Sequence, residues 1–116
     1  MDAHTLFMRK GDKNKKKAMA AGTYFYVKGM TWNLLDRIFV SRNLTERKNS
    51  LQVNPRSYRI HWNNLVTKTF KYDDRSSFYY GNVINKVPLR YNHGSNSTRD
   101  AGFSDHLPVS IELTIR

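Results

Sequence analysis

The stretch that decides the fold lies near the end of the chain and reads Gly102-Phe103-Ser104-Asp105-His106-Leu107-Pro108-Val109. From Leu107 onward, apolar and polar residues alternate strictly, with Leu107, Val109, Ile111, Leu113 and Ile115 as the apolar set. Strict alternation is typical of a half-buried strand. We therefore predict a strand from Leu107 to Arg116, with Asp105 and His106 at its mouth.

An aspartate and a histidine side by side at the mouth of a strand suggest chemistry. A carboxylate is a hard oxygen ligand for divalent cations, and an imidazole can move protons near neutral pH. Together, Asp105 and His106 suggest metal-assisted hydrolysis. The dipeptide alone is common and specific to nothing, so the rest of the chain must decide.

Asp36 is the second informative residue, because it interrupts the apolar run Leu34–Ser41. That run predicts a strand buried on both faces, paired as a hairpin with Thr23–Lys28 around a loop at Gly29–Thr31. A buried carboxylate needs a partner, and His106 is a natural one if the two strands lie close together in one sheet. A carboxylate that orients an imidazole is a hydrolase arrangement; an ordinary satisfied strand aspartate is the alternative.

Composition sets the outer limits of the interpretation. The 116 residues suffice for one domain, and the absence of cysteine excludes disulfides and cysteine-ligated zinc. The net charge of +11 attracts polyanions such as nucleic acid. No apolar run approaches the roughly 18 residues needed to span a bilayer. The basic start does not resemble a signal peptide. The compartment stays unknown, because absence of cysteine fits both cytosol and secretion.

The remaining segments carry weaker predictions of local structure. Periodicity and composition predict the following elements: the end of a helix at Ala3–Met8, a basic loop at Arg9–Lys17, a strand at Ser57–Trp62, a helix at Asn63–Tyr72 and a long connection at Pro88–Gly102.

Three stretches together resemble the endonuclease/exonuclease/phosphatase superfamily, which has the DNase I-like fold. The stretches are Gly22-Thr23-Tyr24-Phe25-Tyr26, Trp32-Asn33-Leu34-Leu35-Asp36-Arg37-Ile38-Phe39-Val40-Ser41, and Pro88-Leu89-Arg90-Tyr91 leading into Gly102-Phe103-Ser104-Asp105-His106-Leu107-Pro108-Val109. Their order and rough spacing also fit. The resemblance implies an α/β (α+β) fold, the C-terminal half of a four-layer sandwich, with mostly antiparallel sheet and one or two short helices.

The resemblance also implies roles at matching positions. His106 would be the active-site imidazole, Asp36 would orient it, and Asp105 would belong to a site for Mg²⁺, Mn²⁺ or Ca²⁺. No role is carried onto Asn33, Arg37 or Arg90. The implied activity is metal-dependent hydrolysis of phosphoester bonds, with nucleic acid favoured by the basic charge.

The likeness covers only the C-terminal part of the family domain. The family's early Asn, metal-binding Glu and central Asp-x-Asn motif have no match here, and Gly11-Asp12-Lys13-Asn14 lacks the preceding apolar strand. We therefore expect residues 1–116 to be part of a larger domain, inactive alone, with no metal necessarily bound. We also expect the chain to self-associate through the exposed face of its sheet, which should carry many of its aromatic residues.

Two other functions stay open. The chain could be a noncatalytic basic module that binds nucleic acid through Lys10–Lys17 and its aromatic residues. It could also be a structural or partner-binding remnant without chemistry.

Overall fold

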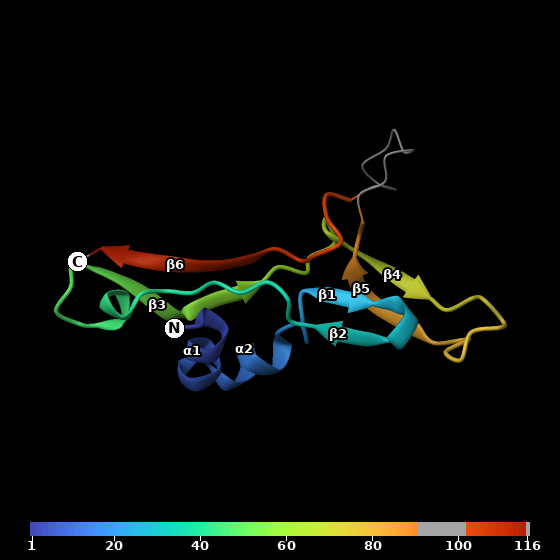
Figure 1. The fold of residues 1–116 in the computed structure, drawn as a ribbon, viewed down its shortest axis with the longest axis horizontal. Helices are drawn as coiled ribbons and strands as arrows, with labels where there is room; N and C mark the ends of the chain where they lie inside the picture. The colour runs from blue at the N-terminus through green and yellow to red at the C-terminus, as the bar shows by residue number, and fades with distance from the viewer. Residues whose placement is uncertain (91–101, 116) are drawn as a thin grey trace. The chain divides into compact units, whose positions relative to one another are not determined.

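The chain folds into antiparallel strand pairs and two short helices, and its computed structural model describes residues 1–90 and 102–115. It divides into two compact units (Figure 1). Unit 1 contains Met1–Ala20, Asp36–Ile60 and Val109–Arg116, and unit 2 contains Ala21–Leu35 and His61–Pro108. The predicted mixture of helix and mostly antiparallel strand is confirmed. Most of the predicted connection Pro88–Gly102 lies outside the described residues.

Unit 1 begins with two short helices that are each capped by an aspartate. In α1 (Ala3–Lys10) the Asp2 carboxylate accepts a hydrogen bond from the His4 amide. In α2 (Lys13–Ala18) the Asp12 carboxylate accepts from the amides of Asn14 and Lys15, at 2.8 and 3.1 Å. Side-chain caps of this kind satisfy the free amides of a first helical turn.

The second helix corrects the prediction of a basic loop at Arg9–Lys17. Arg9 and Lys10 form the last turn of α1, and the lysines that follow belong to α2. The lysine run suggested a solvated coil, but Asp12 supplies the cap, and lysines near a helix C-terminus interact favourably with the helix dipole. The helical conformation predicted at Ala3–Met8 is confirmed, but these residues begin α1, behind the Asp2 cap, instead of ending a helix.

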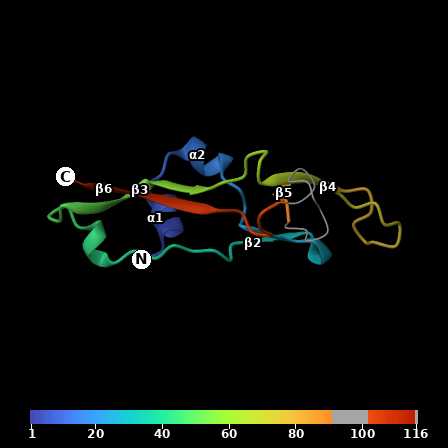
Figure 2. The same ribbon diagram turned by 90° about the horizontal axis from the view of Figure 1, so that it is seen from above.

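The sheet of unit 1 consists of β3 (Leu51–Ile60) paired antiparallel with β6 (Val109–Ile115), side by side in Figures 1 and 2. The strand predicted from alternation is therefore confirmed. The prediction that one face of this strand is buried is wrong beyond Ile111, because the side chains of Leu113 and Ile115 are 49% and 81% exposed. The strand predicted at Ser57–Trp62 forms the end of the longer β3.

The core of unit 1 includes an aliphatic cluster as well as the buried rings of Phe7 and Tyr58. Leu6 of α1, Val53 of β3 and Val40 pack together, with Leu44 and Ile111 against them. Val40 follows an extended segment that pairs with the start of the chain, where the Ala3 amide donates to the Ile38 carbonyl at 2.8 Å. A short 3-10 helix, η2 (Arg42–Thr45), comes next.

The strand predicted at Leu34–Ser41, buried on both faces, is wrong. Only an isolated bridge between Asp2 and Phe39 forms there, and Leu35 and Phe39 are exposed. Its apolar composition is that of a buried strand, yet its backbone pairs with residues next to α1 instead of joining a sheet.

Unit 2 contains a hairpin at the predicted first strand, but its second strand is not the predicted Leu34–Ser41. Here β1 (Tyr24–Tyr26) pairs antiparallel with β2 (Thr31–Asn33), joined by the 3-10 helix η1 (Val27–Gly29). Met30 closes the loop in the left-handed conformation, with φ of 47°. The loop thus lies one residue or two earlier than the predicted Gly29–Thr31, and the second strand ends at Asn33.

A second hairpin, β4 (Thr67–Lys71) and β5 (Val83–Pro88), completes unit 2 and overturns the predicted helix at Asn63–Tyr72. The Asn63 carboxamide accepts a hydrogen bond from the Leu65 amide at 2.9 Å and forms a turn there. Local side-chain bonds of this kind compete with helix formation, and pairing with β5 then fixes the following residues as strand.

The core of unit 2 is largely aromatic and joins the two hairpins. Phe25, Tyr72 and Val87 are its buried centre. The Tyr72 hydroxyl donates a 2.6 Å hydrogen bond to the carbonyl of Val27, so β4–β5 and the β1–β2 loop are linked. This frame supports the segment that carries Asp105 and His106.

Candidate functional site

The segment that carries Asp105 and His106 is held in unit 2 by backbone hydrogen bonds. The Gly102 amide donates to the Arg90 carbonyl at 2.8 Å, and the Leu107 amide donates to the Thr23 carbonyl at 2.7 Å. Leu107 is fully buried. A Cβ on Gly102 would lie 1.5 Å from the Leu89 carbonyl oxygen, so only glycine fits. The segment is therefore anchored on both sides of the Asp-His pair.

His106 lies against β1. It forms an isolated bridge with Tyr24, and the two rings are 5.3 Å apart between centroids. The His106 amide donates to the Ser104 hydroxyl at 3.0 Å. The His106 Nε2 atom lies 3.9 Å from Asp105 Oδ1, which is too long for a hydrogen bond. The side chains of both Asp105 and His106 reach solvent.

A cation lies on the same tyrosine. The guanidinium carbon of Arg90 is 5.9 Å from the centroid of the Tyr24 ring, within the range of a cation–π interaction. Tyr24 therefore contacts both Arg90 and His106. Arg90 suits an anionic ligand, because guanidinium binds phosphate and carboxylate oxygens in a bidentate manner.

The predicted partner of His106 lies in the other unit. Asp36 belongs to unit 1, whereas Asp105 and His106 belong to unit 2. The hydrogen bond between Asp36 and His106 stays a prediction.

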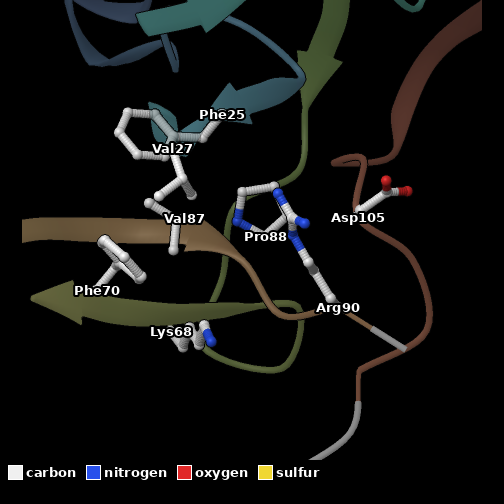
Figure 3. A pocket seen from close by; sticks show the side chains of 8 residues that line it. All are labelled: Phe25, Val27, Lys68, Phe70, Val87, Pro88, Arg90 and Asp105. Atoms are coloured by element: carbon white, nitrogen blue, oxygen red, sulfur yellow. The ribbon is translucent and has the colours of Figure 1, made fainter. Parts of the chain in front are cut away.

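A pocket in unit 2 adjoins the Asp-His segment (Figure 3). Its volume is about 240 Å³, and its apolar lining comes from Phe25, Val27, Phe70, Val87 and Pro88. The charged residues of the lining, within the described part of the chain, are Lys68, Arg90 and Asp105. The pocket thus combines an apolar wall with two cations and one carboxylate, and it shares Asp105 with the predicted site.

The described residues do not by themselves fit the divalent cation that the resemblance implies. Within 1–90 and 102–115, no three His, Asp or Glu side chains gather as metal ligands. Asp105 offers one exposed carboxylate, while Mg²⁺ and Ca²⁺ take about six or more oxygen ligands.

Outside this site, two titratable groups of unit 1 are shifted. Burial lowers the pKa of His4, against the opposing effect of Asp2. Burial also raises the pKa of Tyr58, with Asp2 adding to it. The edge of the His4 ring meets the Tyr58 ring at 5.5 Å between centroids. Among the described residues, the buried Tyr58 hydroxyl has no hydrogen-bond partner.

No known protein family, curated protein or solved structure matches the chain. The family resemblance therefore rests on the three sequence stretches alone. No helix in the described part of the chain is long and apolar enough to cross a membrane.

Sequence reasoning missed three residues of this region. Tyr24 was read only as part of a strand, Arg90 was given no role, and Lys68 fell within a predicted helix. No local signal identifies Lys68, because it joins the pocket only through the pairing of β4 with β5.

Proposed function

We propose that the chain is the C-terminal portion of a DNase I-like domain whose complete form hydrolyses phosphoester bonds with the help of Mg²⁺, Mn²⁺ or Ca²⁺. One observation carries the proposal: Asp105 and His106 sit on an anchored segment, with His106 and Arg90 both against the Tyr24 ring. An imidazole and a guanidinium that contact the same tyrosine ring support a phosphoryl ligand at this segment.

In this proposal His106 stabilises the charge that builds on the phosphoryl oxygens or transfers a proton there. Asp36 orients the His106 ring, and Asp105 contributes to the metal site. Since Asp105 is a single carboxylate, the ion needs further oxygen ligands from outside the described residues. The chain alone is therefore expected to be inactive or nearly so.

The test follows the ring signals of the four histidines by NMR while inorganic phosphate is added. His106 is assigned with a His106→Gln variant. We expect saturable shifts of His106, and about tenfold weaker binding in Arg90→Gln, as for loss of a charged hydrogen bond worth about 1.5 kcal/mol. Arg59→Gln, an exposed arginine of unit 1, is the matched control. Unmoved His106 signals would refute the proposal.

Activity provides a second test. The chain is incubated with Mg²⁺ or Mn²⁺ and plasmid or single-stranded DNA. We expect no cleavage above background. Magnesium-dependent cleavage that disappears in His106→Ala would support the phosphoesterase but overturn the inactivity of the isolated chain.

The noncatalytic nucleic-acid-binding module is the second candidate, and α2 is the observation that favours it. The helix buries none of its residues and presents a run of lysines. Binding to DNA that falls steeply with salt, survives His106→Ala and Asp36→Asn, and is lost when the α2 lysines become glutamine would favour this function.

We also propose that the chain self-associates through the apolar face of the β3–β6 sheet. Leu51 pairs with Ile115, and Val53 with Leu113. Of these four, only Val53 is buried. Unpartnered apolar surface favours association. Light scattering after size exclusion should show a mass above 13.6 kDa that falls in Leu113→Ser. A stable monomer at high concentration would contradict it.

A further inference from the structure

The pocket of unit 2 has a preformed floor. Phe25 and Val87, which line it, are also two of the three residues at the buried centre of the core, each 3% exposed. The Phe25 ring packs 5.3 Å from the Trp32 ring between centroids. Phe70 lines the pocket from β4, and its ring meets Tyr72 edge-on at 4.9 Å. Residues packed in this way do not need to rearrange for a ligand to bind.

The size of the pocket limits what can bind. Its volume of about 240 Å³ lies just below the roughly 300–1,000 Å³ of pockets that enclose a drug-sized molecule. It therefore suits one part of a larger ligand, or a small ligand of about the size of one nucleotide. An apolar wall in which the Phe70 ring is partly exposed favours a flat ring over a polar sugar.

The charges of the pocket favour an anion. Lys68 and Arg90 both line it, and in the described part of the chain neither forms an ion pair with a carboxylate. Among the described residues of the lining, Asp105 is the one acidic residue. Two cations beside an apolar wall match a molecule with a phosphate at one end and a flat ring at the other.

We propose that this pocket binds a single nucleotide unit. The base lies against the partly exposed Phe70, above the buried floor of Phe25 and Val87, and Lys68 and Arg90 hold its phosphate. Contact between a base and an aromatic side chain is worth about 1–3 kcal/mol and tolerates every base. That the nucleotide belongs to a nucleic-acid substrate rests on the proposed function, whereas its binding does not.

Tryptophan fluorescence offers a direct test, because both tryptophans belong to unit 2. In a Trp62→Phe background only Trp32 remains, and it contacts the Phe25 floor. The probes are thymidine 5′-monophosphate, thymidine, inorganic phosphate and glucose 6-phosphate, at constant ionic strength. We expect the nucleotide to bind at least tenfold more tightly than the other three.

Variants then assign the contacts. Lys68→Gln and Arg90→Gln should each weaken nucleotide binding about tenfold, whereas Lys71→Gln, on the same strand but outside the lining, should not. Equal loss in Lys71→Gln would reduce the effect to general charge attraction and overturn the proposal. So would tighter binding of glucose 6-phosphate, or no fluorescence change with any probe.

The outcome is separable from that of the proposed function. Nucleotide binding that depends on Lys68 and Arg90, without any shift of the His106 signals, would support the pocket proposal and contradict the phosphoesterase proposal. Shifts of the His106 signals with phosphate, without a change of Trp32 fluorescence on addition of nucleotide, would support the phosphoesterase proposal and contradict the pocket proposal.

Discussion

The two units differ in where their positively charged side chains lie and in how the hydroxyl of a buried tyrosine is hydrogen-bonded. In unit 1 the lysines of α2 lie on a helix with no buried residue, whereas in unit 2 Lys68 and Arg90 flank an apolar pocket. Unit 1 buries Tyr58 without a partner for its hydroxyl among the described residues, whereas unit 2 uses Tyr72 to link its two hairpins. Positive charge therefore lies on an exposed helix at α2 and beside an apolar pocket at Lys68 and Arg90, and we propose the second arrangement as the binding site.

The largest expected effect is a loss of stability in unit 2, caused by a substitution in the segment that precedes β6. Gly102→Ala would place a methyl group against the Leu89 carbonyl, and we expect a loss of about 3 kcal/mol in the free energy of unfolding. Gly81→Ala is the control. Gly81 has φ of 88° but open space around it, so strain alone should cost about 1 kcal/mol. Urea unfolding followed by tryptophan fluorescence measures both, and equal losses would remove the argument for anchoring.

Tyr72→Phe should weaken the link between the hairpins of unit 2. It removes the hydrogen bond to the Val27 carbonyl and leaves that acceptor without this donor. We expect a loss of about 1 kcal/mol in the free energy of unfolding. Tryptophan fluorescence during urea unfolding is the readout. An unchanged midpoint would mean that the aromatic packing, and not the hydroxyl, joins the hairpins.

Tyr58→Phe, in unit 1, should raise the free energy of unfolding instead of lowering it. The variant keeps the ring contacts with His4 and Phe7 and removes a buried hydroxyl that has no partner among the described residues. We expect a gain of up to about 1 kcal/mol. Far-UV circular dichroism is the suitable signal, because α1 and α2 both belong to unit 1. A loss of stability would show that the hydroxyl is satisfied in solution.

The smallest effect is a pH dependence of unit 1. Burial lowers the pKa of His4 in the folded chain. As the pH falls, His4 is therefore protonated at a higher pH in the unfolded chain than in the folded chain. The free energy of unfolding should therefore fall as pH drops through the ordinary histidine pKa of about 6.5, and level off below the folded pKa. His4→Asn should flatten this part of the profile. An identical slope in the variant would assign the dependence to another group.

The parts of the fold that could be predicted are those set by local pattern. Strict alternation identified β6, and the β-forming residues Thr23–Lys28 identified β1 within a hairpin. The misses came from competing interactions. The Asp12 cap made a helix from the lysine run, and pairing with β5 made a strand of β4.

The candidate site also contains residues that the sequence could predict and residues that it could not. The position of Asp105 and His106 before β6 could be predicted, because it follows directly from the alternation. The neighbours Tyr24, Arg90 and Lys68 could not, since they come together only when β1, β4 and β5 form one core. Asp36 stood out in the sequence because it interrupts an apolar run, and the structure places it in unit 1.

One measurement tests the contrast between the units most directly: backbone and histidine-ring chemical shifts of the whole chain during titration with thymidine 5′-monophosphate. We predict saturable shifts at Phe70, Val87 and Arg90 around the pocket and at His106, with α2 little affected. Shifts confined to the α2 lysines and abolished by moderate salt would contradict this account, and the chain would then bind anions through its exposed charge alone.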